Sequence, residues 1–399
     1  MVGGGFSKER LARMRETLGG YVSRGEVPGM VTAVSRRGET HVEAVGSKAV
    51  GGKDAMRADT IFRIASMTKP VTAVAAMILV EECKLRLDEA IDKWLPELAD
   101  RRVLKDVDGS VDDTEPAKRA LTLRDLLTFR AGYGFIVAAA QDAPIQKALA
   151  EAGLAPGPML PAFAPNEYMA RLGRVPLAYQ PGEQWLYHTC SDILGVLIAR
   201  VSGQSLEAFF RERIFVPLGM SDTSFSVPGA KIDRLATCYQ VNAQTGAFDI
   251  FDDAKDSRWS KPPVFASGGG GLVSTIDDFL VFGQMMLGFG KLGRERILSR
   301  PSVETMISDQ LTAEQRAANP MFFGDNRSWG FGVSMVIKRD ATASVPGRFG
   351  WEGGYGTSWA SDPHEGLVGV LLTQVLWSSP QGPRVYHDFW TSAYQALDD

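Results

Sequence analysis

Residues 62–70 read Phe-Arg-Ile-Ala-Ser-Met-Thr-Lys-Pro, which places a serine three positions before a lysine at the start of a long apolar run. Ser66 and Lys69 are the only pair in the chain with this Ser-x-x-Lys spacing. Residues 67–80 are predicted to form a helix that is apolar on every side, and such a helix is buried. Pro70 is compatible with it, because the first helical turn has no N–H partners to lose.

This spacing puts Ser66 at the helix N-terminus and Lys69 one turn further on the same face. The free N–H groups and the helix dipole stabilise negative charge near Ser66. A serine nucleophile needs a base, and burial can lower the pKa of a lysine far enough for it to serve as one. A plain N-cap serine explains Ser66 equally well, so the motif alone leaves catalysis and helix capping both open.

Composition excludes several classes of protein. The chain has 399 residues with 45% hydrophobic and 23% charged side chains, which is typical of a globular protein with one large or two medium domains. A net charge of −4 gives no indication of nucleic acid or an anionic membrane as a partner. The N-terminus lacks the apolar segment of a secretory signal, and no run reaches the ~18 apolar residues that span a bilayer. A cytoplasmic protein is therefore expected.

No metal or other cofactor is indicated. The three cysteines are widely spaced without a C-x-x-C pair, and buried free thiols in a reducing compartment are expected. The histidines show no ligand spacing with one another or with cysteine. The expected partner is a small-molecule substrate, and the sequence leaves the oligomeric state open.

The order of elements predicts a mixed α/β (α+β) fold. Apolar patterns predict a first helix, a hairpin, two central helical segments, three C-terminal strands and a closing helix. In that order, the predicted elements cover residues 11–22, 31–45, 85–98, 121–127, 331–337, 357–361, 366–373 and 385–393. Strands at both ends with helices between them predict one antiparallel sheet built from the N- and C-terminal segments.

Two domains are predicted. Residues 1–82 and 328–399 would form a discontinuous α/β sheet domain, residues 83–327 a mostly helical domain, and the active site would lie between them. An alanine-rich stretch at 138–152 and a proline-rich one at 155–165 resemble an inserted flap.

Serine–lysine chemistry also needs a proton shuttle and an oxyanion hole. Two segments could supply them. Residues 181–192 contain a Pro-Gly turn followed by Tyr187 and an apolar helix. Residues 349–356 read Phe-Gly-Trp-Glu-Gly-Gly-Tyr-Gly, and glycines there let backbone N–H groups approach a ligand closely.

With these motifs the chain resembles the serine β-lactamase-related hydrolases, close to class C β-lactamases and penicillin-binding carboxypeptidases, and most of all the family VIII carboxylesterases. The matching features also include Leu126-Leu127-Thr128 and residues 267–275, so the similarity covers nearly the whole chain. The resemblance implies a class C β-lactamase-like fold, Ser66 as the acylated nucleophile, and Lys69 with Tyr187 as the residues that hold and relay its proton. The sequence does not settle which of the two is the base.

The resemblance also implies an oxyanion hole from the backbone N–H groups of Ser66 and Gly354. Trp351 and Gly353 would contact the substrate, and aromatic residues including Tyr133 could line an acyl pocket. Core packing is the alternative for these aromatic residues, above all for Trp185 and Trp359.

Two departures from the β-lactamase pattern bear on the substrate. Their asparagine two residues after the tyrosine is Thr189 here, and their Lys-Thr-Gly is Trp351-Glu352-Gly353. The amide and the ammonium that would bind a β-lactam are therefore absent from these positions, while a tryptophan and an acidic Glu352 favour an uncharged, apolar group. A short-chain carboxylic ester is the predicted substrate.

Other functions remain as alternatives: a β-lactamase, a D-amino-acid peptidase or another amide hydrolase, an acyltransferase, or a non-catalytic penicillin-binding-like module. A Ser-His-Asp triad with His188 and Asp192 is disfavoured because the chain has no Gly-x-Ser-x-Gly elbow. His188 is expected to pack or to hydrogen-bond locally.

Overall fold

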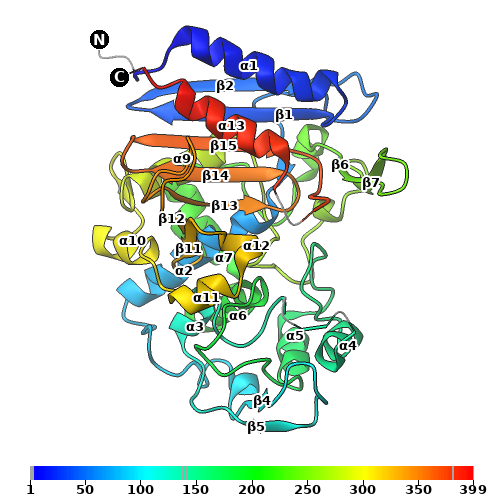
Figure 1. The fold of residues 1–399 in the computed structure, drawn as a ribbon, viewed down its shortest axis with the longest axis vertical. Helices are drawn as coiled ribbons and strands as arrows, with labels where there is room; N and C mark the ends of the chain where they lie inside the picture. The colour runs from blue at the N-terminus through cyan, green and yellow to red at the C-terminus, as the bar shows by residue number, and fades with distance from the viewer. Residues whose placement is uncertain (1–3, 137–138, 141, 380–381, 399) are drawn as a thin grey trace.

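A seven-stranded antiparallel sheet is the largest layer of the protein (Figure 1). The computed structural model describes residues 4–136, 139–140, 142–379 and 382–398. The strand order is β11-β12-β13-β14-β15-β1-β2, so the two N-terminal strands pair with the C-terminal ones through β1 and β15. The strands are β1 Gly29–Arg36, β2 Glu39–Gly46, β11 Arg327–Trp329, β12 Ser334–Val336, β13 Phe349–Gly353, β14 Thr357–Asp362 and β15 Leu367–Thr373. The predicted sheet from both ends of the chain is confirmed.

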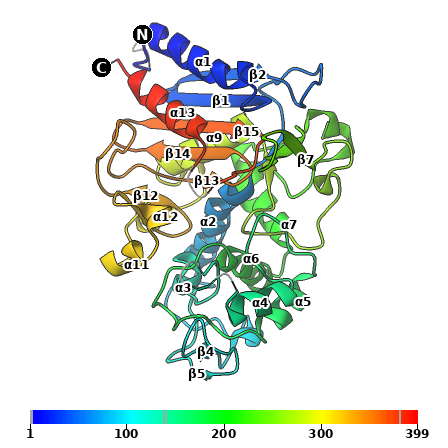
Figure 2. The same cartoon turned by 45° about the vertical axis from the view of Figure 1, so that its right-hand side comes forward.

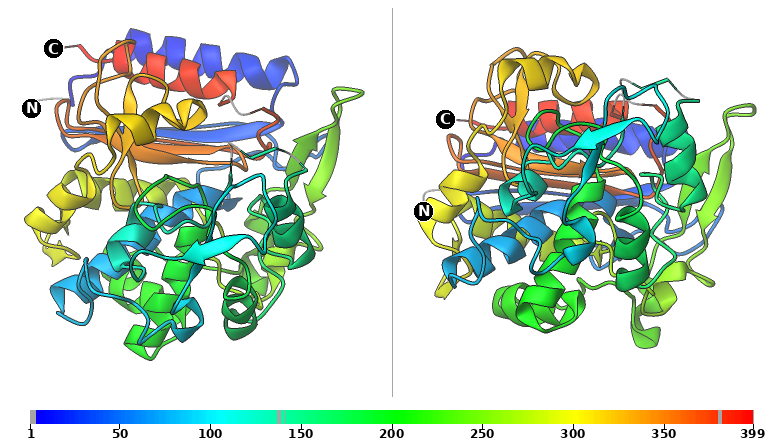
Figure 3. Two further views of the ribbon diagram at one scale, coloured as in Figure 1. Left: turned by 60° about the horizontal axis from the view of Figure 1, so that its bottom comes forward. Right: turned by 90° about the horizontal axis from the view of Figure 1, so that it is seen from below.

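Helices cover both faces of this sheet (Figure 3). On one face, α1 (Lys8–Ser23) and α13 (Arg384–Gln395) bury a separate apolar cluster that includes Leu18 and Phe389. On the other face, α9 (Ile276–Leu287) packs against β14 and β15, and its Gly283 lies so close to Trp359 that an added methyl group would collide with the indole. Because helices cover both faces of the sheet, strands β1 and β15 are buried along their whole length.

The remaining helices lie around α2 (Thr68–Glu81), which runs from the sheet into the helical region, or beside the edge of the sheet at β11 and β12 (Figure 2). They are α3 Leu123–Leu127, α4 Pro144–Glu151, α5 Pro165–Leu172, α6 Thr189–Ser202, α7 Leu206–Phe210, α8 Val216–Leu218, α10 Arg300–Met306, α11 Ala313–Ala317 and α12 Pro320–Phe323. Short strand pairs complete the fold: β3 Phe62–Arg63 with β8 Val273–Ser274, β4 Arg102–Leu104 with β5 Thr114–Pro116, β6 Cys238–Val241 with β7 Phe248–Asp252, and β9 Lys291–Leu292 with β10 Glu295–Arg296.

Most predicted elements form, and one does not. The segment 85–98 contains only a 3-10 turn at Pro96–Leu98 instead of a helix. Leu85, Ile91, Leu95 and Leu98 are buried. The Ile91 N–H donates to the Leu121 carbonyl, and the Leu87 carbonyl accepts from the Arg124 N–H. Contacts with the α3 region thus hold this segment in an irregular conformation that satisfies the same apolar spacing.

Other expectations have mixed outcomes. Cys190 and Cys238 are buried, but Cys83 is exposed, because it follows the C-terminal end of α2 at the surface. The predicted flap contains α4 and the first residue of α5, while its residues 138 and 141 lie outside the described part of the chain. Within the described ranges no single helix is long and apolar enough to cross a membrane, and only the bent pair Thr189–Ser202 with Leu206–Leu218 meets that test by length and composition.

Candidate active site

Ser66 lies in a 3-10 turn, Ala65–Met67, immediately before α2. Strand β3 delivers the chain to this turn and is paired with β8, whose preceding loop is the glycine cluster 267–271. Ala65 has a φ of 45°, in the left-handed region that a residue with a side chain rarely adopts. Such strain concentrates at functional sites, where the surrounding structure enforces it.

Lys69 is 1% exposed and its amine makes three polar contacts. Nζ lies 2.9 Å from Ser66 Oγ, 2.6 Å from the carbonyl oxygen of Gly269 and 3.3 Å from Nδ1 of His188. Ser66 and Lys69 are therefore neighbours, as the sequence predicted. The glycine cluster contributes the Gly269 carbonyl oxygen that binds the Lys69 amine. No carboxylate bonds directly to the amine among the described residues.

Tyr187 joins this pair from the segment that precedes α6. Its ring lies beneath Lys69, with Nζ 4.7 Å from the ring centroid, and the neighbouring Ser66 side chain lowers the pKa of its hydroxyl. The indole Nε1 of Trp351 donates to the same hydroxyl at 2.7 Å. Trp185 stacks on Tyr187 at 5.7 Å between centroids and is fully buried, which confirms core packing for Trp185.

Strand β13 brings Trp351 and the two following glycines to Ser66. A methyl group added at Gly353 would lie 2.3 Å from the carbonyl oxygen of Ile64 and 2.2 Å from Thr357 Oγ1, so only glycine permits this close approach. At Gly354 an added methyl group would meet no atom within 4 Å, which places this residue at open space beside the turn. The two predicted oxyanion donors, Ser66 and Gly354, thus come from segments that are packed together.

His188 is a residue of this site for which the sequence predicted only local packing or a local hydrogen bond. Its ring lies between Lys69 and Asp192, whose Oδ2 is 3.5 Å from Nε2. Asp192 is 2% exposed and accepts hydrogen bonds from Ser267 Oγ at 2.6 Å and from the Gly269 N–H at 2.9 Å. Thr189, the predicted counterpart of the β-lactamase asparagine, is buried in the first turn of α6, and the contact with Lys69 is made by His188 instead.

Burial dominates the electrostatics of these residues, called here the Ser66 cluster (Ser66, Lys69, Tyr187, His188 and Trp351). Burial lowers the pKa of Lys69 from its ordinary value to about 7, against the opposing charge of Asp192. Burial raises the pKa of Tyr187 well above that of an ordinary phenol, although its hydrogen bonds with Ser66 and Trp351 oppose this. A neutral amine is therefore accessible near pH 7, whereas the phenol stays protonated.

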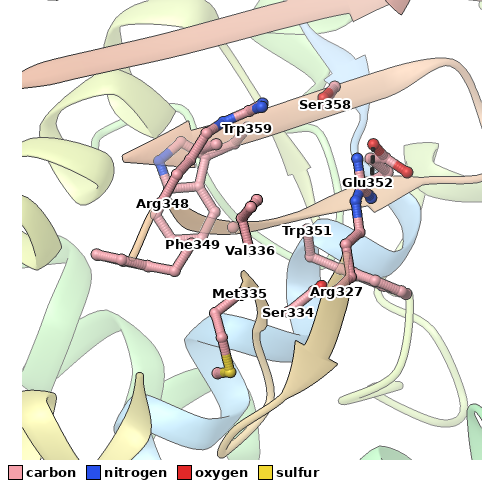
Figure 4. A pocket seen from close by; sticks show the side chains of 12 residues that line it. Arg327, Ser334, Met335, Val336, Arg348, Phe349, Trp351, Glu352, Ser358 and Trp359 are labelled. Carbon is pink, nitrogen blue, oxygen red and sulfur yellow. Dashed lines mark hydrogen bonds and ion pairs between the residues drawn. The ribbon is translucent and has the colours of Figure 1, made fainter. Parts of the chain in front are cut away.

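The polar groups of Tyr133, a predicted pocket residue, and of Glu352 contact partners outside the Ser66 cluster. The Tyr133 hydroxyl donates to the Leu172 carbonyl at 3.2 Å, and the residue is 3% exposed, so its hydroxyl is directed into the helical region. Glu352 alternates with Trp351 along β13 and lies 3.5 Å from Arg327 (Figure 4). Its register partner Ser358 faces α13, because Ser358 accepts a hydrogen bond from Trp390. Glu352 therefore points away from the Ser66 cluster, and its carboxylate does not line the site as the sequence argument assumed.

The described residues contain no group of three or more His, Cys, Asp or Glu side chains that could hold a metal ion.

Trp359 is 1% exposed and packs edge-on against Phe279 of α9, in agreement with the core-packing alternative.

Comparison with known proteins places these features in a family. The family model described as Beta-lactamase matches residues 14–384. Protein Rv1367c of Mycobacterium tuberculosis (strain ATCC 25618 / H37Rv) is 38% identical over 364 residues, which cover 88% of this chain and 86% of that protein. Esterase EstB of Burkholderia gladioli is 30% identical over 376 residues, covering 89% of this chain and 88% of the relative.

Solved structures agree with the fold. The structure described as EstCE1, a hydrolase with promiscuous acyltransferase activity, superposes with a TM-score of 0.81 at 24% identity, covering 97% of this chain and 99% of that one. Curated relatives include proteins named as esterases and proteins named as acyltransferases. The resemblance inferred from the motifs is thereby confirmed: the chain belongs to the β-lactamase family, within its serine hydrolases and acyltransferases.

Proposed function

We propose that this protein hydrolyses short-chain carboxylic esters through an acyl-enzyme formed on Ser66. The observation that carries the proposal is the hydrogen bond of 2.9 Å between Lys69 Nζ and Ser66 Oγ, made by an amine whose pKa burial lowers to about 7. A neutral amine at that distance can take the proton of the serine as Oγ attacks the ester carbonyl. Esterase EstB, a relative at 30% identity, carries the same activity in its name.

Each remaining residue of the Ser66 cluster has a proposed role. The N–H groups of Ser66 and Gly354 stabilise the oxyanion, as donors placed where negative charge develops. Because its pKa is raised, Tyr187 acts as a neutral phenol that donates a proton to the departing alkoxide, and Lys69 is the base that accepts the proton of Ser66. The alcohol leaves with the proton of Tyr187, and the proton that Lys69 took from Ser66 then passes to the phenolate, so that both groups are neutral again. In deacylation, Lys69 takes one proton from the attacking water as its oxygen bonds to the acyl carbon; the bond to Ser66 Oγ then breaks, and Oγ receives that proton to restore the hydroxyl.

The preference for an ester over a β-lactam rests on Trp351. Its indole N–H is used by Tyr187, and it supplies no positive charge for the carboxylate of a β-lactam. His188 likewise presents a ring nitrogen to Lys69 where an amide side chain would be needed to bind an acylamide. An uncharged ester needs neither a positive charge to bind a carboxylate nor an amide side chain to bind an acylamide.

The test begins with covalent labelling of Ser66. Incubation with a fluorophosphonate is expected to add mass to the peptide that contains Ser66, and the variant Ser66→Ala should lose both the label and turnover. Ser110→Ala, at an exposed serine between β4 and β5, is the matched control and should keep both. Label on another residue with Ser66 untouched would refute the acyl-enzyme.

Substrate class is tested separately. p-Nitrophenyl acetate, butyrate and octanoate are compared with a chromogenic cephalosporin, and hydrolysis chiefly of the esters is expected. Turnover mainly of the cephalosporin would favour the amide-hydrolase alternative, while weak cephalosporin turnover would not, because both substrates share the acyl-enzyme.

Acyl transfer is the second candidate function, and it is favoured by the curated relatives that are named acyltransferases. It uses the same first step and differs only in the acceptor, an alcohol in place of water. Adding alcohol acceptors to the ester assay separates the two, since transfer yields a new ester and raises release of p-nitrophenol above the hydrolytic rate.

A further inference from the structure

We propose that His188, held by Asp192, is a positioning residue that directs the lone pair of the Lys69 amine at the Ser66 hydroxyl. The inference rests on the proposed acyl-enzyme chemistry and adds a residue pair to it. Its basis is the set of contacts that surrounds Lys69 on three sides.

The contacts of Lys69 determine where its lone pair points. A neutral amine has two N–H bonds and one lone pair. The Gly269 carbonyl oxygen, 2.6 Å away, is an acceptor only, so it takes one N–H. If Nδ1 of His188, 3.3 Å away, takes the second, the lone pair is left for the Ser66 hydroxyl at 2.9 Å. Without an acceptor at His188 the amine can rotate and present an N–H to Ser66, which would prevent proton transfer from the serine.

Asp192 determines the tautomer that makes His188 an acceptor. The carboxylate of Asp192 can only accept a hydrogen bond, and its Oδ2 lies 3.5 Å from Nε2 of His188. The proton of the neutral ring therefore belongs on Nε2, and Nδ1 keeps its lone pair for Lys69. Asp192 is itself fixed by Ser267 and by the Gly269 N–H, so the same loop holds the carboxylate and supplies the carbonyl that binds Lys69.

The backbone at His188 supports a role at the site. Its φ of 90° and ψ of −68° lie outside the regions that residues with a side chain normally occupy. This conformation allows Tyr187 and His188, although adjacent, both to contact Lys69 from different sides. Strain of this kind persists where the surrounding structure enforces it.

The charges around His188 keep it neutral when Lys69 is the base. Burial lowers the pKa of His188, and the charge of Lys69 lowers it further, while Asp192 opposes both. The titratable groups that face the ring are Lys69 from α2, Asp192 from α6 and the phenol of Tyr187. Glu352 of β13 lies on the far side of the strand, and its charge raises the pKa of that phenol. Protonation of His188 would remove the acceptor and place a second positive charge beside Lys69.

Three variants test the proposal in the full-length protein. His188→Leu removes the acceptor, His188→Asn restores one with its side-chain oxygen, and Asp192→Asn lets an amide N–H favour the opposite tautomer. We expect His188→Leu and Asp192→Asn to lower kcat for p-nitrophenyl butyrate at least tenfold with less than a threefold change in KM. His188→Asn should recover a large part of that loss. His364→Leu, at an exposed histidine, is the control.

Two readouts separate positioning from a merely structural role. Loss of the acceptor removes a hydrogen bond that is stronger to the ammonium than to the amine, so His188→Leu should shift the acidic limb of the kcat/KM profile to lower pH. Nitrogen NMR of the protein, which has four histidines, should show His188 as the Nε2–H tautomer in the wild type. The measurement does not depend on turnover.

The outcomes are distinct. A wild type that labels on Ser66 and turns over esters, with His188→Leu unchanged in kcat and in its acidic limb, overturns this inference alone. An Nδ1–H tautomer in the wild type also overturns it. Failure of the wild type to label on Ser66 overturns the proposed function and this inference with it. Because Asp192→Asn also changes the contacts with Ser267 and Gly269, kcat is normalised to the fraction of protein that the fluorophosphonate titrates.

Discussion

The indole Nε1 of Trp351 lies 2.7 Å from the hydroxyl oxygen of Tyr187, and this hydrogen bond joins the sheet to the segment that begins α6. The indole can only donate, so the phenol oxygen accepts and its own proton stays available for Ser66 or a leaving group. The aromatic ring of Trp351 also packs edge-on against Trp329 at 4.7 Å between centroids. By the resemblance to β-lactamases, Trp351 occupies the position of the lysine in their Lys-Thr-Gly motif. Its indole provides a hydrogen-bond donor that carries no charge.

Trp351→Phe removes this donor while keeping an aromatic ring. We expect kcat for p-nitrophenyl butyrate to fall about tenfold, which corresponds to ~1.4 kcal/mol, because Tyr187 loses the partner that orients its hydroxyl. KM should change little. Trp390→Phe is the matched control, since it loses a similar hydrogen bond from Nε1 to Ser358 on the other face of the sheet. It should lower the melting temperature and leave kcat unchanged; equal losses of kcat in both variants would contradict the role given to Trp351.

Activity is expected to depend on pH through Lys69. Because burial lowers the pKa of Lys69 to about 7, the neutral amine is the minor form below pH 7 and the major form above it. kcat/KM should therefore rise with pH and be about tenfold higher at pH 8 than at pH 6. No loss is expected up to pH 10, because the pKa of Tyr187 is raised above the ordinary phenol value. A decline of kcat/KM between pH 7 and pH 9 would be inconsistent with Lys69 as the base.

The close approach of β13 to the Ser66 turn predicts different effects at two adjacent glycines. Gly353→Ala would bring Cβ to 2.3 Å from the Ile64 carbonyl oxygen, so β13 must move away from the turn. We expect a loss of ~1–3 kcal/mol in the free energy of unfolding and a large loss of kcat. Gly354→Ala meets no atom within 4 Å and should leave the free energy of unfolding unchanged within ~0.5 kcal/mol. Urea unfolding of both variants measures the difference; equal destabilisation would show that the steric argument is wrong.

A buried ion pair anchors strand β3, which leads to Ser66. Arg63 Nε donates to Asp252 Oδ2 at 2.7 Å, and both side chains are almost fully buried. Asp252→Asn would leave the guanidinium without its charge partner and is expected to cost ~3–5 kcal/mol in the free energy of unfolding. Asp249→Asn, at an exposed position of the same strand β7, should have almost no effect on the thermal melt.

The same ion pair contributes to acid sensitivity. Burial alone would raise the pKa of Asp252, but Arg63, Ser257 and the Arg258 N–H hold it below the ordinary value. A carboxyl whose pKa is lowered by folding contributes stability above its unfolded pKa of ~4, and the contribution is lost as pH falls further. The melting temperature of the wild type should therefore drop between pH 5 and pH 3 more steeply than that of Asp252→Asn. Parallel curves would exclude this contribution.

The sequence by itself determined the parts of the site that depend on local geometry. Ser66 and Lys69 share a helix face because three residues make almost one turn, and an apolar run from residue 67 can only be a buried helix. The hairpin of β1 and β2 follows from an apolar, β-branched run, a turn and an alternating run, and it forms where expected. The family resemblance also followed from the sequence, because its motifs occur in the right order along nearly the whole chain.

Tertiary structure alone decided which residues complete the site. Trp351 and Tyr187 are 164 positions apart, and Lys69 and Gly269 are 200 apart, so no local pattern relates them. Counting residues after Tyr187 matched Thr189 to the β-lactamase asparagine and left His188 with a local packing or hydrogen-bonding role. The φ of 90° at His188 turns that side chain to the amine instead, and Asp192 holds it there. Such a conformation is imposed by packing against its intrinsic cost, which is why the sequence could predict that Ser66 and Lys69 are neighbours but not that His188 contacts Lys69.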